Sequence, residues 1–180
     1  MASPSRYGAV AIVLHWLIAV LVIANITLGL AFTNTPAAEQ GVSALPPLHK
    51  SIGLTILLLS LLRLAWRLTH RPPPPLQPFP LLARAVHWAF YLLLIAVPLA
   101  GWALVSVSPR SIPTEYFGLL VWPHIGFLHA IPLPQRRADI SAFVATHNLL
   151  AFLAAGLIVL HVAGALYHMM RRDGAMKRIL

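Results

Sequence analysis

Four long apolar runs dominate the chain, and short polar or proline-rich stretches separate them. Because about 20 apolar residues cross the hydrocarbon core of a bilayer, each run predicts a membrane-spanning helix. The second run carries Arg63 and Arg67 near one end, where long cationic side chains can reach water. The runs cover approximately residues 9–32, 48–68, 82–107 and 140–170. We therefore expect one all-α integral membrane domain over residues 1–180, an up-down bundle of four transmembrane helices.

Prolines mark the two longest connections between these runs. Residues 71–80 include four consecutive prolines, Pro72 to Pro75, and predict a stiff extended connector that no helix crosses. Residues 108–139 carry five more prolines and predict a long irregular loop. We expect this loop to cap one membrane face.

Composition excludes a water-soluble globule. Hydrophobic residues make up 59% of the chain and charged residues 9%, against roughly 45–50% and about 25% in soluble domains. The formal charge of +9 does not indicate nucleic-acid binding, because the cations lie between apolar runs and form no basic face on a soluble scaffold. The absence of cysteine excludes disulfides, iron–sulfur clusters and covalently attached haem.

The distribution of Lys and Arg predicts the orientation in the membrane. With a cytoplasmic N-terminus, nine of the thirteen cationic residues fall on the cytoplasmic side, as the positive-inside rule requires. Both termini are then cytoplasmic, and the loop over residues 108–139 is periplasmic.

Histidines carry the candidate chemistry, since ionisable groups within spans are costly and mark function. The chain has nine. His147 and His161 lie 14 residues apart on the fourth run, so a helix places them about 40° out of register and roughly 21 Å apart. One helix thus offers two imidazoles to the bundle interior, one near each membrane face.

Depth in the membrane assigns each of these imidazoles a partner. His15 lies near the cytoplasmic end of the first span and pairs with His161, whereas His49 begins the second span on the periplasmic side and pairs with His147. Two bis-imidazole sites stacked across a bilayer are what two non-covalent haem b groups require. Iron with two histidine ligands has no open position for oxygen activation, which favours electron transfer. The bundle is therefore expected to enclose two haems.

Further residues fall on the same layers. Arg63, 14 residues after His49, is a candidate partner of a haem propionate. Gly29 and Gly101 fall at the periplasmic layer, where we expect them to leave room for a flat macrocycle. His87 is a candidate contact of a propionate or a quinone, and His168 is a candidate contact of a propionate. His87 also remains the alternative to His15 as a haem ligand.

The order and spacing of these motifs resemble the bacterial cytochrome b561 family of four-helix, di-haem membrane cytochromes. The resemblance covers essentially the whole chain, with Asn148 in place of the usual acidic residue and no matching pattern in the loop over residues 108–139. It is carried by Leu14-His15-Trp16-Leu17, Leu48-His49-Lys50-Ser51-Ile52-Gly53, Leu62-Arg63-Leu64, the proline run, His87 to Pro98 and Gly101, His147, Leu160-His161 to His168, and Asp173-Gly174.

The resemblance implies an oxidoreductase of the bacterial inner membrane that moves electrons between a periplasmic donor and ubiquinone or another quinone. Superoxide is a candidate donor, and Lys50, Arg136 and Arg137 near the outer site would attract such an anion. Lipid is the surrounding partner, and the sequence assigns no catalytic residue. Two alternatives remain: a cytochrome b anchor subunit of a larger dehydrogenase, and a haem-free metal or proton transporter.

Overall fold

Long antiparallel helices form almost all of the structure. The computed structural model describes residues 6–34, 44–70 and 80–171, and the proline run Pro72 to Pro75 lies outside them. Its helices are α1 (Ala9–Thr33), α3 (Leu45–Thr69), α4 (Pro80–Val107), the short α5 (Gly126–His129) and α6 (Leu133–Arg171). Strands β1 (Thr114–Tyr116) and β2 (Leu120–Trp122) form an antiparallel hairpin.

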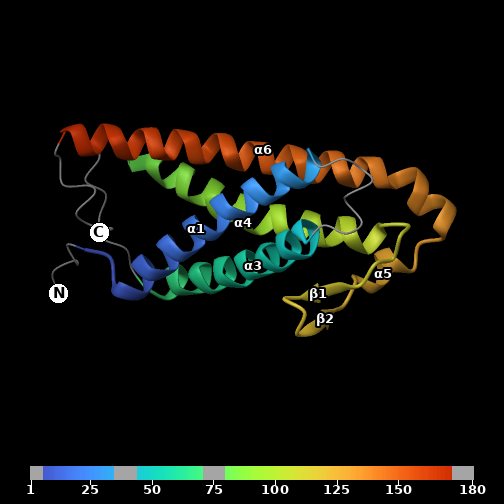
Figure 1. Ribbon diagram of the computed structural model, residues 1–180. Coiled ribbons are helices and arrows are strands. Elements are labelled where there is room, and N and C mark those ends of the chain that lie inside the picture. The colour runs from blue at the N-terminus through green and yellow to red at the C-terminus, as the bar shows by residue number, and fades with distance from the viewer. Residues whose placement is uncertain (1–5, 35–43, 71–79, 172–180) are drawn as a thin grey trace.

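Within the described ranges, four helices are long and apolar enough to cross a membrane: α1, α3, α4 and α6. They alternate in direction, which confirms the predicted all-α, up-down bundle (Figure 1). A helix satisfies its own backbone hydrogen bonds, the condition for crossing lipid. Much of the outward surface is apolar: Leu92, Phe152 and Val159, for example, are each about two-thirds exposed (68%, 67% and 68%).

The interior of the bundle is an apolar cluster at mid-height. Ile18 and Val22 of α1 and Ile56 of α3 are buried, and Leu94 of α4 and Ile158 of α6 pack against them. Close packing pairs α1 with α3, α4 with α6 and α3 with α4. The central cluster thus joins all four long helices.

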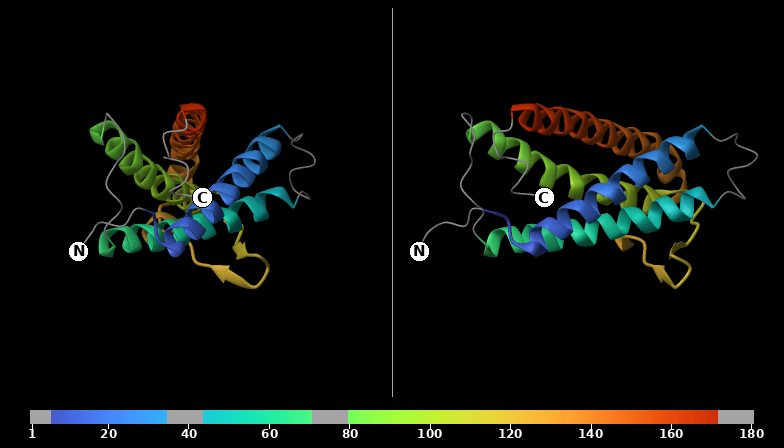
Figure 2. Two further views of the ribbon diagram at one scale, coloured as in Figure 1. Left: turned by 90° about the vertical axis from the view of Figure 1, so that its left-hand side faces the viewer. Right: turned by 60° about the vertical axis from the view of Figure 1, so that its left-hand side comes forward.

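The segment between α4 and α6 differs from the irregular loop that the prolines predict. It contains the hairpin and α5, and α6 begins at Leu133 instead of near residue 140. Pro134 does not prevent this early start, because the first turn of a helix needs no amide donor from proline. We call residues 108–132 the cap. It lies at one end of the bundle, with the hairpin on the α3 side in all three views (Figures 1 and 2).

Two serines attach the cap to the helices. The Ser51 oxygen accepts a hydrogen bond from the Phe117 N–H at 3.0 Å, and its hydroxyl lies 3.1 Å from the Glu115 carbonyl oxygen. The Ser106 oxygen accepts from the Ile125 N–H at 2.9 Å. The Ser51 hydroxyl also lies 2.9 Å from the Pro47 carbonyl oxygen of its own helix, so it links α3 to β1 and to the residue that follows this strand.

Candidate functional site

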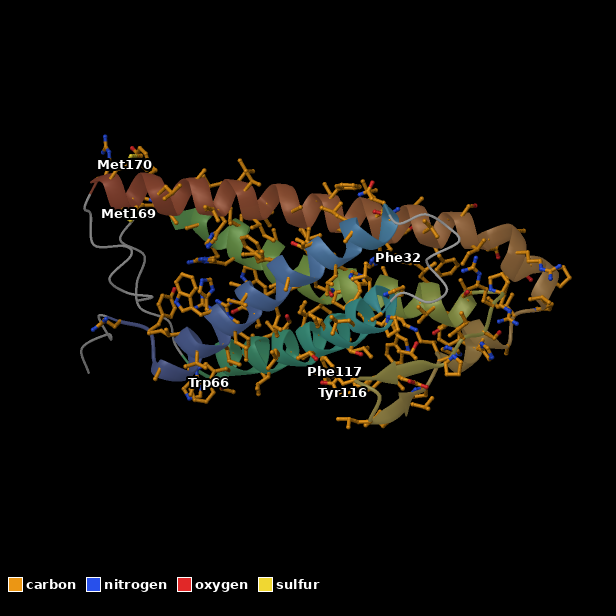
Figure 3. The ribbon with its side chains drawn as sticks, in the orientation of Figure 1. Phe32, Trp66, Tyr116, Phe117, Met169 and Met170 are labelled. Atoms are coloured by element: carbon orange, nitrogen blue, oxygen red, sulfur yellow. The ribbon has the colours of Figure 1, made fainter. Side chains whose placement is uncertain are left out.

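The bundle has two distinguishable ends, and each holds a pair of histidines. Trp66, Met169 and Met170 lie at one end, whereas Phe32 and the hairpin residue Tyr116 lie toward the other (Figure 3). We call His49 and His147 the cap-side pair. We call His15 and His161 the terminus-side pair. Ile18 and Val22 of the central cluster follow His15 in α1, and Ile56 follows His49 in α3, so apolar packing separates the two pairs.

The cap-side pair joins α3 to α6. The ring centroids of His49 and His147 are 6.2 Å apart, and their planes are at 89°. The Nδ1 atom of His49 lies 3.0 Å from the carbonyl oxygen of Asn25 on α1. The Nδ1 atom of His147 lies 3.1 Å from the carbonyl oxygen of Val97 on α4. An acceptor at Nδ1 fixes the proton there and leaves Nε2 as the ligating nitrogen.

The terminus-side pair joins α1 to α6. The ring centroids of His15 and His161 are also 6.2 Å apart, with the planes at 67°. Phe90 of α4 packs edge-on against His161 at 5.1 Å. In contrast to the cap-side histidines, His15 has a buried Nδ1 with no hydrogen-bond partner.

Both pairs fit the spacing of axial ligands on one haem iron. Metal–imidazole bonds of about 2.0 Å, with about 1.2 Å from each nitrogen to its ring centre, place two axial centroids about 6 Å apart. The observed separation of 6.2 Å in both pairs matches this value. Among the described residues, no three or more His, Asp or Glu side chains gather as they would around a bare metal ion.

Two further predicted site residues, Arg63 and His87, lie near the terminus-side pair. The Arg63 guanidinium lies over the Tyr91 ring at 5.8 Å, and its charge acts on both His15 and His161. His87 lies close enough to His15 and His161 for charge on these rings to interact. The ring contact of His161 is with His15, which favours His15 over His87 as its partner. His168 packs against Tyr167 at 5.5 Å.

Cations gather at the cap side. Lys50 donates to the Pro113 carbonyl oxygen at 3.5 Å, and Arg136 donates to the Ser111 hydroxyl at 3.3 Å and the Ser108 carbonyl oxygen at 3.4 Å. Arg137 is exposed. Two of these three cations thus also hold the cap in place.

Two elements of the site were missed in the sequence analysis. They are the backbone carbonyl oxygens of Asn25 and Val97. Every residue has a backbone carbonyl, so residue type does not distinguish these two. The signal that would have located them is the glycine four residues after each, Gly29 and Gly101. These glycines lie against the imidazoles of His49 and His147 themselves, so each of them leaves room for a histidine ring.

Comparison with known proteins assigns the family. The chain has the fold of a four-helix membrane protein with paired interior histidines, and the family model for prokaryotic cytochrome b561 matches residues 6–180. "Cytochrome b561 homolog 2" of Escherichia coli (strain K12) is 32% identical over 99% of this chain and 93% of its own length. "Probable superoxide oxidase CybB" of Yersinia pestis is 30% identical over 97% and 96%.

The chain therefore belongs to the prokaryotic cytochrome b561 family, as its motifs predict. It is a multi-pass bacterial membrane protein and a membrane oxidoreductase that takes part in electron transfer. Membership of the family also implies binding of haem b.

Proposed function

We propose that this protein is a di-haem b cytochrome of the bacterial inner membrane that carries electrons from a periplasmic donor to the quinone pool. The observation that carries the proposal is the pair of imidazole sites, each with a centroid separation of 6.2 Å, in separate layers of one bundle. In the orientation that we propose, both termini are cytoplasmic and the cap faces the periplasm. Bound haem b supplies one-electron redox chemistry at each pair.

The chain's own residues bind and orient the cofactors. His49 with His147, and His15 with His161, are the pairs that we propose would hold the two haems. Arg63 is the proposed partner of a propionate, because helices α1, α3 and α4 contain no Asp or Glu to balance its charge. His87 and His168 are the proposed polar contacts of a propionate or of the quinone ring on the same side.

Superoxide is the donor that we propose. Lys50, Arg136 and Arg137 give the cap side a positive field that would attract a small anion, and the Yersinia pestis relative is named as a superoxide oxidase. Each superoxide gives up one electron and leaves as dioxygen. Two such electrons and two protons from the cytoplasmic side convert one quinone into quinol.

Haem content is the first test. The purified protein should show a reduced-minus-oxidised spectrum of b-type haem, and a pyridine haemochrome assay should count two haems per chain. His147→Ala should remove the cap-side haem and His161→Ala the terminus-side haem. His70→Ala is the matched control, because His70 stacks on Trp66 at the end of α3, away from both pairs. A colourless protein, or two haems retained in either ligand variant, would contradict the proposal.

The donor needs a separate test. Superoxide mixed with the oxidised protein should reduce the cap-side haem, and the rate should fall as ionic strength rises. Lys50→Gln should slow this reduction, whereas Arg84→Gln on the opposite side should not. A rate that responds neither to salt nor to Lys50 would exclude the proposed electrostatic attraction and leave the haem assignment intact.

A further inference from the structure

The two cap-side histidines contact the same backbone arrangement in two different helices. We call this arrangement, a carbonyl oxygen at the histidine Nδ1 and a glycine four residues later against the ring, a seat. His49 reaches the carbonyl oxygen of Asn25, four residues before Gly29 in α1. His147 reaches the carbonyl oxygen of Val97, four residues before Gly101 in α4. Each imidazole thus lies across one helical turn. Its Nδ1 atom faces a carbonyl oxygen at the start of the turn, and its Cε1 atom faces the glycine at the end.

Helix geometry explains why glycine is needed at the fourth position. A helical side chain leans toward the N-terminus and covers the turn before its own Cα. A Cβ at Gly29 would lie 3.1 Å from His49 Cε1 and 3.5 Å from its Nδ1. A Cβ at Gly101 would lie 3.1 and 3.3 Å from the same atoms of His147. Both contacts are tight against a ring that is already tied to the carbonyl, so the ring would have to shift.

Among the described residues, no such seat is found at the terminus-side pair. The Nδ1 atom of His15 is buried and has no partner, and the structure gives His161 ring contacts without a carbonyl bond. The charge of Arg63 acts on this pair. The two sites therefore share a centroid spacing but differ in the hydrogen bonding and charge around their imidazoles.

We propose that Gly29 and Gly101 are positioning residues, each opening a backbone carbonyl that orients a cap-side histidine and lowers the reduction potential of the cap-side haem below that of the terminus-side haem. This inference rests on the proposed function. An Nδ1–H bond raises the basicity of the ligating nitrogen, and a more basic ligand favours oxidised iron. Electrons then pass downhill from the cap side to the terminus side.

The test compares four glycine variants of the purified holoprotein. Gly29→Ala and Gly101→Ala should disturb the seats. Gly156→Ala and Gly164→Ala are matched controls within α6, because a Cβ at either position meets nothing within 4 Å. Redox titration, low-temperature EPR of the oxidised haems and the haem count are recorded for each variant.

Each seat variant should raise one of the two midpoint potentials by about 59 mV. For one electron this shift corresponds to a tenfold change in equilibrium constant. The EPR signal of the same haem should shift while the second haem and both controls keep wild-type values. Loss of the cap-side haem alone also supports the proposal. The proposal is overturned if both potentials stay unchanged, if they move together, or if both haems are lost while the controls keep theirs.

Failure of the proposed function would look different. If the wild-type protein is purified without haem, that function fails, and ¹⁵N NMR of its histidines still tests the seats. His49 and His147 should then show the Nδ1–H tautomer, and Gly29→Ala and Gly101→Ala should each change only the histidine that it faces. Unchanged tautomers in those variants would overturn the seats as well.

Discussion

Arg63 carries a positive charge into the bundle, and within the described residues helices α1, α3 and α4 offer it no Asp or Glu. Arg63 is half-buried on α3, with its guanidinium over Tyr91, and its charge acts on the terminus-side pair. A positive charge in surroundings of low dielectric favours the reduced state of a nearby centre. The residue therefore adds to the potential difference that the glycine seats are proposed to set.

Replacing Arg63 should change one haem only. Arg63→Leu should lower the midpoint potential of the terminus-side haem by on the order of tens of millivolts, and redox titration measures this. Arg63→Lys keeps the charge and should recover most of the shift, although it loses a bidentate contact with a propionate. An unchanged potential in Arg63→Leu would remove this residue from the haem environment.

One histidine of the cap should make the cap sensitive to pH. Burial lowers the pKa of His124, and the neighbouring His129 ring, 4.7 Å away, lowers it further, as do Lys50 and Arg136. The folded state thus binds fewer protons than the unfolded state below the ordinary pKa of about 6.5. Stability of the cap is full above that pH and falls as the solution is acidified toward the lowered pKa.

Hydrogen exchange of the cap amides measures this effect. Between pH 7 and pH 5.5, protection in the cap of the wild-type protein should fall, after correction for the intrinsic pH dependence of exchange. His124→Gln should flatten the response, whereas His70→Gln, at the opposite end of α3, should not. A cap that responds equally in all three proteins would show that another group titrates.

At the scale of elements, the Ser51 hydroxyl is one of the groups that attach the hairpin to α3. Ser51 and Ser60 are both about 1% exposed on the same helix, but Ser51 bonds to β1 while the Ser60 hydroxyl has no partner. Ser51→Ala removes the acceptor of the Phe117 N–H and the contact with the Glu115 carbonyl oxygen, which costs about 1–3 kcal/mol locally. Ser60→Ala removes an unpaired polar group and should be neutral or stabilising.

Amide exchange at Phe117 distinguishes the two serine variants. Exchange in Ser51→Ala should be faster than in wild type by about tenfold or more, with little change in Ser60→Ala. Equal protection in both variants would show that Thr55, whose hydroxyl lies 3.0 Å from the Tyr116 hydroxyl, is sufficient to hold the hairpin.

The elements also show what a sequence reveals and what it does not. Spans longer than 20 apolar residues and a 14-residue histidine spacing are local patterns, so the four helices and the placement of His15, His49, His147 and His161 were predictable. The hairpin depends on Ser51 bonding to residues more than 60 positions away. Such long-range bonds produce no periodic pattern in the sequence. Proline content alone predicted an irregular loop over residues 108–139, where the structure has a hairpin, α5 and the first turns of α6.

At the scale of the whole molecule, the proposed direction of electron transfer follows from differences between the two ends of the bundle. Both ends of the bundle present an imidazole pair with a 6.2 Å centroid separation. Among the described residues, the carbonyl seats and the cations Lys50, Arg136 and Arg137 lie on the cap side, whereas Arg63 and His87 belong to the other end. A negative donor at the cap and a proton-consuming acceptor at the opposite face both fit this arrangement, provided that the cap faces the periplasm.

The orientation can be tested directly because the chain contains no cysteine. Phe127→Cys on α5 and Met170→Cys near the end of α6 are a matched pair, since these side chains are 76% and 73% exposed. A membrane-impermeant maleimide should label Phe127→Cys in intact spheroplasts and Met170→Cys only after the membrane is opened. The reverse pattern would place the cap in the cytoplasm. The cationic cap side would then face away from a periplasmic donor, and electrons would have to enter at the terminus-side pair.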